Sequence, residues 1–341
     1  MKTALLFVLS FFTLVARGEN VLNVYCWDEY LPKDVLEEFT KRTGTRVTLT
    51  LYDSNEAMLA KLSAGGGGAT YDVVFPSEYA VRILADKGLA REIDKSKIPN
   101  WKNLDPRLLD KSYDPRNKYA MPYFFGTTGI GYDVKAAGQV DSWGALFDPK
   151  FGGKVIMLND MRECFAAALR TAGKGVNEKD VAALKAAGEK LRAQKKLVKA
   201  YDSDNFATEL QKGAAVVAHG FNGQFAKMMA EEPAGKFAYV VPKEGGTVWI
   251  DNAAIPAKAV NPDAAHAFLN FLLEPEIGAR VVNSAKYASA NLAAREKVDP
   301  AVLKNEVIYP TDEVLKRCEF MEHDGRAAAV QAALWRQIKG E

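Results

Sequence analysis

Strand and helix patterns alternate along residues 21–87, and this alternation restricts the fold more than any other feature of the chain. The predicted strands are 21–27, 45–52 and 72–75, and the predicted helices are 33–42, a segment that begins near 53–56, and a segment that ends near 87. Strands that are connected by helices form a mostly parallel sheet with helices packed on its faces. The sequence therefore predicts an α/β fold.

Local signals in this region set the limits and the faces of its elements. Asp53 and Glu56 have the spacing of a capping box, which predicts the start of a helix. The glycine run 65–68 is expected to end that helix, since glycine is unfavourable inside helices. Alternation in the second strand predicts an inward-facing row formed by Val47, Leu49 and Leu51.

The remainder of the chain predicts a second α/β unit and a return to the first. Residues 119–132 combine small and aromatic residues, which suits a long strand that crosses between two units. Further predicted elements are strands at 155–158, 214–219 and 237–241 and helices at 142–147, 160–171, 180–195 and 223–230. A chain of 341 residues is long enough for two domains. We therefore expect one lobe from residues 19–126 and 250–296, and a second lobe from residues 127–249 and 297–341.

The first 18 residues have the pattern of a secretory signal peptide. Lys2 supplies a positive charge, residues 4–15 are almost all apolar, and residues 16–18 place small side chains at a cleavage site. No cysteine lies near that point, so a lipid tether is not evident, and attachment through a partner stays open. No segment reaches the roughly 20 apolar residues of a membrane span. We expect a periplasmic or otherwise extracytoplasmic protein.

Charge and cysteine content argue against several classes of function. Loss of Lys2 and Arg17 with the leader changes the formal net charge from +2 to zero, and balanced charge is unfavourable for nucleic-acid binding. Cys26, Cys164 and Cys318 are widely spaced, which favours buried thiols over a disulfide framework, although one pair could form. Cysteine and histidine form no close cluster that predicts a zinc site. We expect no metal, no cofactor and no catalytic residue.

Aromatic and polar residues gather where predicted strands end. The first strand runs into Trp27-Asp28-Glu29-Tyr30 and the third into Ser77-Glu78-Tyr79, and ligands of such sheets bind beyond the carboxyl ends of the strands. In the extended stretch 245–256, Trp249 and Asp251 share one face. An indole and a carboxylate suit an organic ammonium group, because the carboxylate neutralises the charge and the ring attracts the cation. The alternative is an ordinary strand with a buried tryptophan and an exposed aspartate.

Seven ordered motifs together resemble the polyamine-binding periplasmic proteins of ABC importers, most closely the spermidine/putrescine-preferring branch. The motifs are Tyr25–Tyr30, Asp53–Glu56, Pro76-Ser77, Asp160–Glu163, Pro242–Gly246, Trp249–Asp251 and Asn291–Arg295. The resemblance covers essentially the whole chain after residue 18. It implies a two-lobed periplasmic-binding-protein fold of type II, in which each lobe is a mostly parallel sheet with helices on both faces and crossing strands form the hinge. It also implies a monomer that traps a polyamine between its lobes and delivers it to a membrane permease with ATPase subunits.

The resemblance also assigns residues to the polyamine site. One end of the ligand would contact Trp27, Asp28, Glu29 and Tyr30, the first lobe would add Ser77 and Tyr79, the second lobe Asp160 and Glu163, and the aromatic box Phe221, Trp249, Asp251 and Tyr287. Three positions depart from the family pattern. Phe221 stands where tryptophan is usual, Asp28 replaces a neutral hydroxyl residue, and Met321 or Glu322 occupies the place of a glutamine. The added carboxylate favours spermidine, whereas the other two departures weaken that preference.

Other functions remain to be weighed against polyamine binding. Asp160 and Glu163 also have the spacing of a capping box, and Asp160 with Asp251 or Glu163 could form the acid and base of a hydrolase. The same fold could bind another small cation or an amino acid, although the carboxylate of an amino acid would need an arginine or a helix N-terminus. A role in adhesion or signalling is compatible with secretion.

Overall fold

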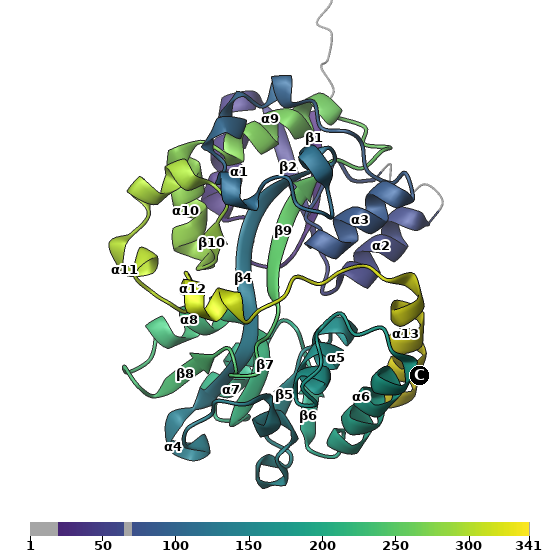
Figure 1. Ribbon diagram of the computed structural model, residues 1–341. Coiled ribbons are helices and arrows are strands. Elements are labelled where there is room, and N and C mark those ends of the chain that lie inside the picture. Colours follow the sequence, from purple (N-terminus) through teal and green to yellow (C-terminus); the bar gives the residue numbers. More distant parts are fainter. Residues whose placement is uncertain (1–19, 65–69, 341) are drawn as a thin grey trace, which may run out of the picture.

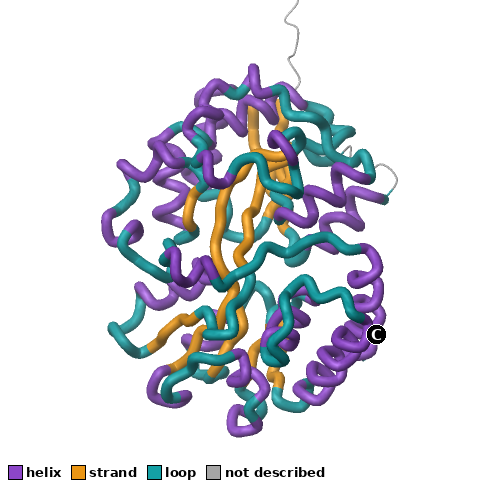
Figure 2. Tube along the Cα trace, in the orientation of Figure 1, coloured by secondary structure: helices purple, strands orange, loops and turns teal. Residues whose placement is uncertain are grey.

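The computed structural model describes residues 20–64 and 70–340, which form two lobes stacked one above the other (Figure 1). The predicted signal peptide, residues 1–18, and the glycine run 65–68 lie outside the described residues. Strands fill the centre of both lobes and helices cover them on the outside (Figure 2). The predicted α/β fold with two lobes and crossing hinge strands is confirmed.

The first lobe, at the top of Figure 1, is built on a sheet with the strand order β2-β1-β3-β9-β4, and β10 pairs with β4. The strands are β1 (Asn20–Cys26), β2 (Thr45–Leu51), β3 (Val73–Val74), β10 (Ala288–Ser289), and part of β4 (Ala120–Asp133) and of β9 (Val248–Ala254). The helices are α1 (Lys33–Thr43), α2 (Asn55–Ser63), α3 (Glu78–Asp86), α9 (Pro262–Leu272), α10 (Pro275–Ala285) and α11 (Pro300–Leu303). β1 pairs in parallel with β2 and β3, whereas β9 and β4 join the sheet antiparallel.

The second lobe continues the sheet from β4 in the order β4-β7-β5-β6, and β8 pairs with β4. Its other strands are β5 (Val155–Met157), β6 (Val198–Tyr201), β7 (Val217–Phe221) and β8 (Phe237–Val240). Its helices are α4 (Val134–Ala137), α5 (Met161–Arg170), α6 (Val181–Gln194), α7 (Phe206–Gln211), α8 (Asn222–Ala230) and α13 (Gly325–Lys339). Short 3₁₀ helices occupy Lys95–Lys97, Pro99–Asn103, Pro106–Leu108, Pro115–Asn117, Trp143–Phe147, Pro149–Phe151 and Leu292–Lys297. Both lobes thus combine a parallel trio of strands with antiparallel strands that lead to the hinge.

Three stretches of chain cross between the lobes. β4 pairs with β9 and β10 in its first half and with β7 and β8 in its second half. β9 begins at the second lobe and ends beside β3 of the first. The third crossing runs through residues 309–324, which include α12 (Asp312–Lys316) and a parallel bridge between Glu319 and Thr247 (Figure 1). This crossing is the yellow segment that passes in front of β4.

Core packing assigns the last part of the chain to the two lobes. Val298, Val302 and Ile308 are buried in the core of the first lobe, together with Phe39 and Phe268. α13 packs instead against α5 and α6 of the second lobe. A lobe boundary at residue 296 therefore does not match this packing, and we place the third crossing after residue 308.

The expectation of a buried face on β2 is wrong, whereas α2 begins where expected but is capped by a different residue. β2 is the edge strand of the sheet, so Leu49 and Leu51 remain 36% and 51% exposed, and Val47 is only half-buried. The N-cap of α2 is Ser54, whose hydroxyl accepts a hydrogen bond from Ala57 N–H. β6 and α7, which the periodicity did not indicate, separate α6 from β7. Strand position within the sheet and cap geometry both depend on contacts that a local pattern does not contain.

The three cysteines form no disulfide bond. Cys26 and Cys164 are buried, Cys318 is half-buried, and all three are free thiols. The thiols therefore act as small apolar side chains in this packing.

Among residues 20–64 and 70–340, no helix has the length and apolar content needed to cross a membrane.

Gly245 offers a direct test of the packing between β9 and the third crossing. Its φ is +83°, and a Cβ atom would lie 2.0 Å from the carbonyl oxygen of Arg317. We expect Gly245→Ala to lower the free energy of unfolding by about 3 kcal/mol, because backbone strain and a clash with backbone act together. Gly44→Ala, at φ +71° in open space, is the control with an expected loss of about 1 kcal/mol. Equal losses in denaturant titrations would contradict the close approach of Arg317.

Candidate functional site

A cavity of about 710 Å³, counted out to its mouth, lies between the two lobes. Both lobes and the hinge strands contribute to its wall. Eleven of the twelve predicted site residues line it, namely Trp27, Asp28, Tyr30, Ser77, Tyr79, Asp160, Glu163, Phe221, Trp249, Asp251 and Tyr287. The fold therefore brings together residues that are up to 260 positions apart in the chain.

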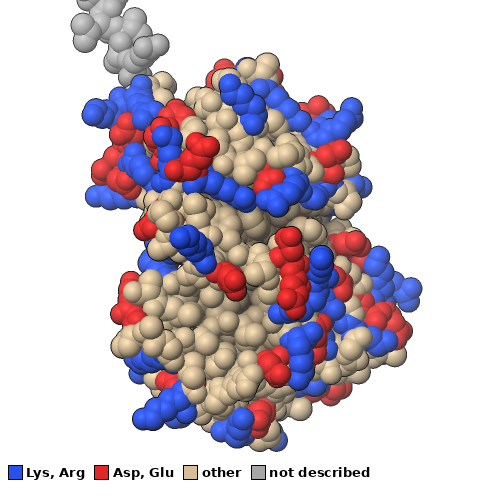
Figure 3. Space-filling view, turned by 60° about the vertical axis from the view of Figure 1, so that its left-hand side comes forward, with Lys and Arg blue, Asp and Glu red and all other residues tan. Residues whose placement is uncertain are grey.

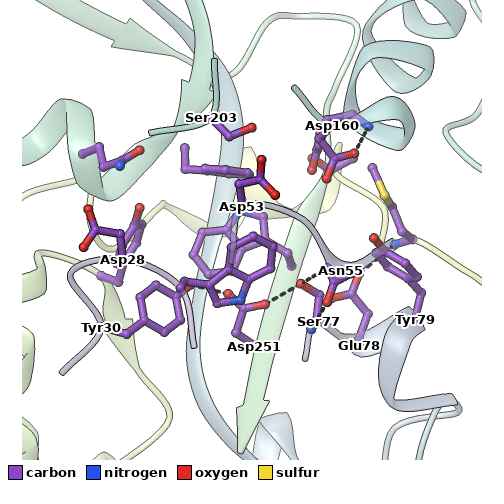
Figure 4. A pocket seen from close by; sticks show the side chains of 18 of the residues that line it. Asp28, Tyr30, Asp53, Asn55, Ser77, Glu78, Tyr79, Asp160, Ser203 and Asp251 are labelled. Carbon is purple, nitrogen blue, oxygen red and sulfur yellow. Dashed lines mark hydrogen bonds between the residues drawn. The ribbon is translucent and has the colours of Figure 1, made fainter. Parts of the chain in front are cut away.

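Asp251 lies at the floor of the cavity, on the hinge strand β9 (Figure 4). Its two carboxylate oxygens accept hydrogen bonds from the Tyr30 hydroxyl and, at 2.6 Å, from the Ser77 hydroxyl. Asn55 in turn holds Ser77 through two hydrogen bonds of 2.9 and 3.1 Å. Burial raises the pKa of Asp251 to about 6, although both hydroxyl donors lower it. A cation beside this buried carboxylate would restore its charged form.

Asp160 and Glu163 face the cavity from the start of α5 in the second lobe. Asp160 Oδ1 accepts the backbone N–H of Glu163 at 3.0 Å, so Asp160 caps α5 as the capping-box spacing predicts. The Glu163 carboxylate accepts hydrogen bonds from the Thr128 and Thr247 hydroxyls at 2.9 to 3.0 Å. Burial and then the neighbouring Asp160 raise the pKa of Glu163 to about 8, and burial and then Glu56 raise that of Asp160 to about 6. Capping one helix and facing the cavity are thus compatible.

Aromatic rings form much of the remaining wall. The ring centroid of Trp249 lies 6.1 Å from that of Phe221 and 5.4 Å from that of Tyr287, and both contacts are edge-on. Trp249 is 6% exposed, and its indole Nε1 has no hydrogen-bond partner among the described residues. Trp27 instead donates its indole N–H to Phe75 O at 2.9 Å. Rings of this kind cover alkyl chains and attract cations to their faces.

The charge of the cavity wall has a single sign. Seven carboxylates line it, and none of its described lining residues is Lys, Arg or His; the carboxylates belong to Asp28, Asp53, Glu78, Asp160, Glu163, Asp204 and Asp251. On the outer face in Figure 3, by contrast, basic and acidic side chains are intermixed. An acidic and aromatic wall selects an organic cation, since each buried carboxylate is stabilised by a positive partner.

Ion pairs connect the lobes beside the cavity. Arg162 of α5 is 10% exposed and pairs with Glu56 of α2 at 3.1 Å, while its guanidinium carbon lies 4.2 Å from the ring centre of Tyr79. Lys227 of α8 pairs with Glu29 across the cleft. Glu29 is therefore the one predicted site residue that does not line the cavity, because its side chain is engaged with Lys227. These two ion pairs hold the lobes against each other beside the cavity.

Eight further residues that line the cavity are not among the twelve predicted site residues. They are Asp53, Asn55, Glu78, Ser203, Asp204, Gln224, Thr247 and Met321. Of the two residues considered for the glutamine position, Met321 lines the wall and Glu322 is exposed. Asp53 and Glu78 belong to sequence motifs described above. Ser203 and Asp204 follow β6, and Gln224 lies in the first turn of α8, so their approach to the cleft depends on the folded second lobe.

Comparisons with known proteins agree with this geometry. A family model described as bacterial extracellular solute-binding protein matches residues 34–311. The spermidine/putrescine-binding periplasmic protein of Escherichia coli (strain K12) is 38% identical over 326 residues, which cover 95% of this chain and 93% of that protein. The putrescine-binding periplasmic protein SpuD of Pseudomonas aeruginosa (strain UCBPP-PA14) is also 38% identical, over 343 residues with the same coverage.

Solved structures extend the comparison to three dimensions. A putative spermidine/putrescine ABC transporter protein from Listeria monocytogenes has a TM-score of 0.89 and 36% identity, covering 94% of this chain and 99% of that one. The family description names solute binding, as expected for a transport protein. The chain therefore belongs to the bacterial extracellular solute-binding proteins, in the family that includes the spermidine/putrescine-binding periplasmic proteins.

Proposed function

We propose that this chain captures a polyamine between its lobes outside the cytoplasm and delivers it to a membrane ABC permease that is driven by ATPase subunits. Spermidine is the favoured ligand and putrescine a second one. The observation that supports this most strongly is the cavity wall, which joins seven carboxylates to aromatic rings and has no basic side chain among its described residues. We also propose that the chain acts as a monomer.

The chemistry of a polyamine matches this wall. Each ammonium group loses its water shell on entry, and an unpaired buried charge would cost several kcal/mol, so each needs a carboxylate. Burial of the methylene groups between rings contributes about 0.8 kcal/mol each. An amino acid fits less well, because its carboxylate would meet further carboxylates and no cation.

Lobe closure follows from the position of the binding groups. Asp251 and Ser77 belong to the hinge and the first lobe, whereas Asp160 and Glu163 belong to the second lobe. Only a closed form lets one ligand touch both sets, so binding shifts the lobes towards closure. The permease would then recognise the closed form.

Thermal unfolding tests the proposed ligands. We expect spermidine and putrescine each to raise the thermal midpoint, because a ligand of the native state alone stabilises that state. The free energy of unfolding should rise with ligand concentration, by about 2.7 kcal/mol when the free ligand is at 100 times its dissociation constant. Glutamate is the control and should leave the midpoint unchanged. Titration calorimetry in which neither amine binds, while another solute does, would refute polyamine capture.

A further inference from the structure

Glu78 is a buried carboxylate of the cavity wall that is not among the twelve predicted site residues, although it lies between two of them, Ser77 and Tyr79. It is the first residue of α3, is 1% exposed, and lies beside Ser77 in the site (Figure 4). Its Oε2 accepts the N–H of Ile250 at 3.1 Å, and its Oε1 accepts the N–H of Met321 at 3.2 Å. The two donors belong to β9 and to the third crossing. One side chain thus connects the first lobe to two of the segments that cross between the lobes.

Among the described residues, the surroundings of Glu78 provide no cation to compensate a negative charge on its carboxyl group. It forms no ion pair with a basic side chain in the described part of the chain. The ionisable groups that face it are Asp251 from β9, Glu163 from α5 and Tyr113 from the loop after the 3₁₀ helix Pro106–Leu108, and none of them is a cation. Burial raises the pKa of Glu78 to about 8, and the two backbone donors lower it. The remaining open direction is the cavity, where a positive group would complete the site.

A purely structural role explains only part of this arrangement. Position at the start of α3 favours an acid, and two backbone donors require an acceptor. Neutral acceptors satisfy backbone donors without the cost of burying a carboxylate next to Asp251. A carboxylate here is favourable when a cation shares the cavity with it.

We propose that Glu78 binds an ammonium group of the ligand and couples that contact, through Ile250 and Met321, to β9 and to the third crossing. This rests on the proposed polyamine function. Pairing with an ammonium ionises Glu78, and an ionised acceptor strengthens its hydrogen bonds to both N–H groups. The ligand therefore tightens the crossing segment at the same time as it fills the cavity, and a proton leaves the site.

Titration calorimetry of three variants separates this role from simple support of the crossing. Asn177 is the matched control, because it makes two hydrogen bonds of 2.8 Å to the same segment, at Phe320 O and Glu322 N–H, from outside the cavity. Glu78→Gln removes the charge, Glu78→Asp shortens the arm but keeps the charge, and Asn177→Ala removes support alone. Binding heats measured near pH 7 in two buffers of different ionisation enthalpy give the number of protons released.

The expected results differ between the variants. Glu78→Gln should weaken spermidine and putrescine roughly 10- to 100-fold and release about one proton fewer than the unmodified protein. Glu78→Asp should bind more weakly yet keep most of the release, and Asn177→Ala should change affinity by no more than about threefold with the release unaltered. Should Glu78→Gln fail to fold, the proposal still fails if Glu78→Asp matches the unmodified protein in affinity.

Two outcomes would overturn the proposal. One is a Glu78→Gln variant with unaltered affinity and proton release. The other is a loss of affinity equal to that of Asn177→Ala with the proton count unchanged, which would assign Glu78 to structural support. Neither outcome touches the polyamine function, which fails only if the unmodified protein binds neither amine.

Discussion

Replacement of Asp251 by alanine is expected to lower the affinity for spermidine and putrescine by at least about a hundredfold, the largest loss from any single residue. The variant leaves a desolvated ammonium without its buried counter-charge, and breaking one side of a buried pair costs about 3 to 5 kcal/mol. The variant also leaves the hydroxyls of Tyr30 and Ser77 without the carboxylate to which they donate in the unmodified protein. Titration calorimetry with both amines, on this variant and on the unmodified protein, measures the loss.

Ser77→Ala is the control for this result. It removes one of the hydrogen bonds to Asp251 and one partner of Asn55, but it leaves the charge in place. We expect a loss of about tenfold or less. Similar losses for the two variants would show that Asp251 is not an ammonium partner. Thermal unfolding without ligand shows whether a variant is also less stable. Burial raises the pKa of Asp251, so the ionised carboxylate is not a favourable charge in the empty protein, and its loss should affect binding more than stability.

Acidification from about pH 8 to about pH 6 is expected to weaken polyamine binding by at least about a hundredfold. Glu163 and Glu78 both have a pKa raised to about 8, so in the empty cavity they bind protons across this range. The ammonium groups of the ligand stay protonated, and the carboxylates must ionise to pair with them. Each such group lowers the affinity by up to tenfold per pH unit below its pKa. Calorimetry over this pH range gives the dependence directly.

The stability of the empty protein should change in the opposite direction. A carboxylate with a folded-state pKa near 8 binds more protons than its unfolded counterpart, whose pKa is 4.5, throughout the interval between these values. The free energy of unfolding therefore falls as the pH rises through that interval. Denaturant titrations without ligand check the sign. An affinity that does not vary between pH 6 and 8 would mean that Glu163 and Glu78 are already ionised in the empty cavity, or are not ligand partners.

Short-range patterns predicted much of the fold. The limits of α1 follow from Pro32 and Gly44, and the long strand 119–132 became β4 almost residue for residue. The pattern failed in β2, where Leu49 and Leu51 alternate as a buried face would and yet lie at the sheet edge. Periodicity indicates which residues share a face, but the neighbour that covers this face comes from elsewhere in the chain.

The candidate site was predictable where charge and aromatic groups adjoin strand ends. Trp249 and Asp251 face the cavity together, as an extended segment requires. Glu29 adjoins three lining residues, but it has a backbone φ of 59° and its side chain pairs with Lys227 instead of lining the cavity. Asp204 and Gln224 belong to the second lobe and enter the wall where that lobe faces the first. Turn conformation and lobe contact are tertiary properties, so local sequence does not contain them.

β4, β9 and residues 309–324 pass side by side between the lobes. A body that is attached through one flexible tether can turn about every axis, whereas three adjacent tethers leave a single easy axis of rotation. The lobes of this protein are accordingly expected to move by rotation about one hinge axis rather than by free reorientation. Few relative orientations need to be sampled before the cleft shuts, so the orientational entropy lost at capture is small. Most of that restriction is already imposed when the chain folds.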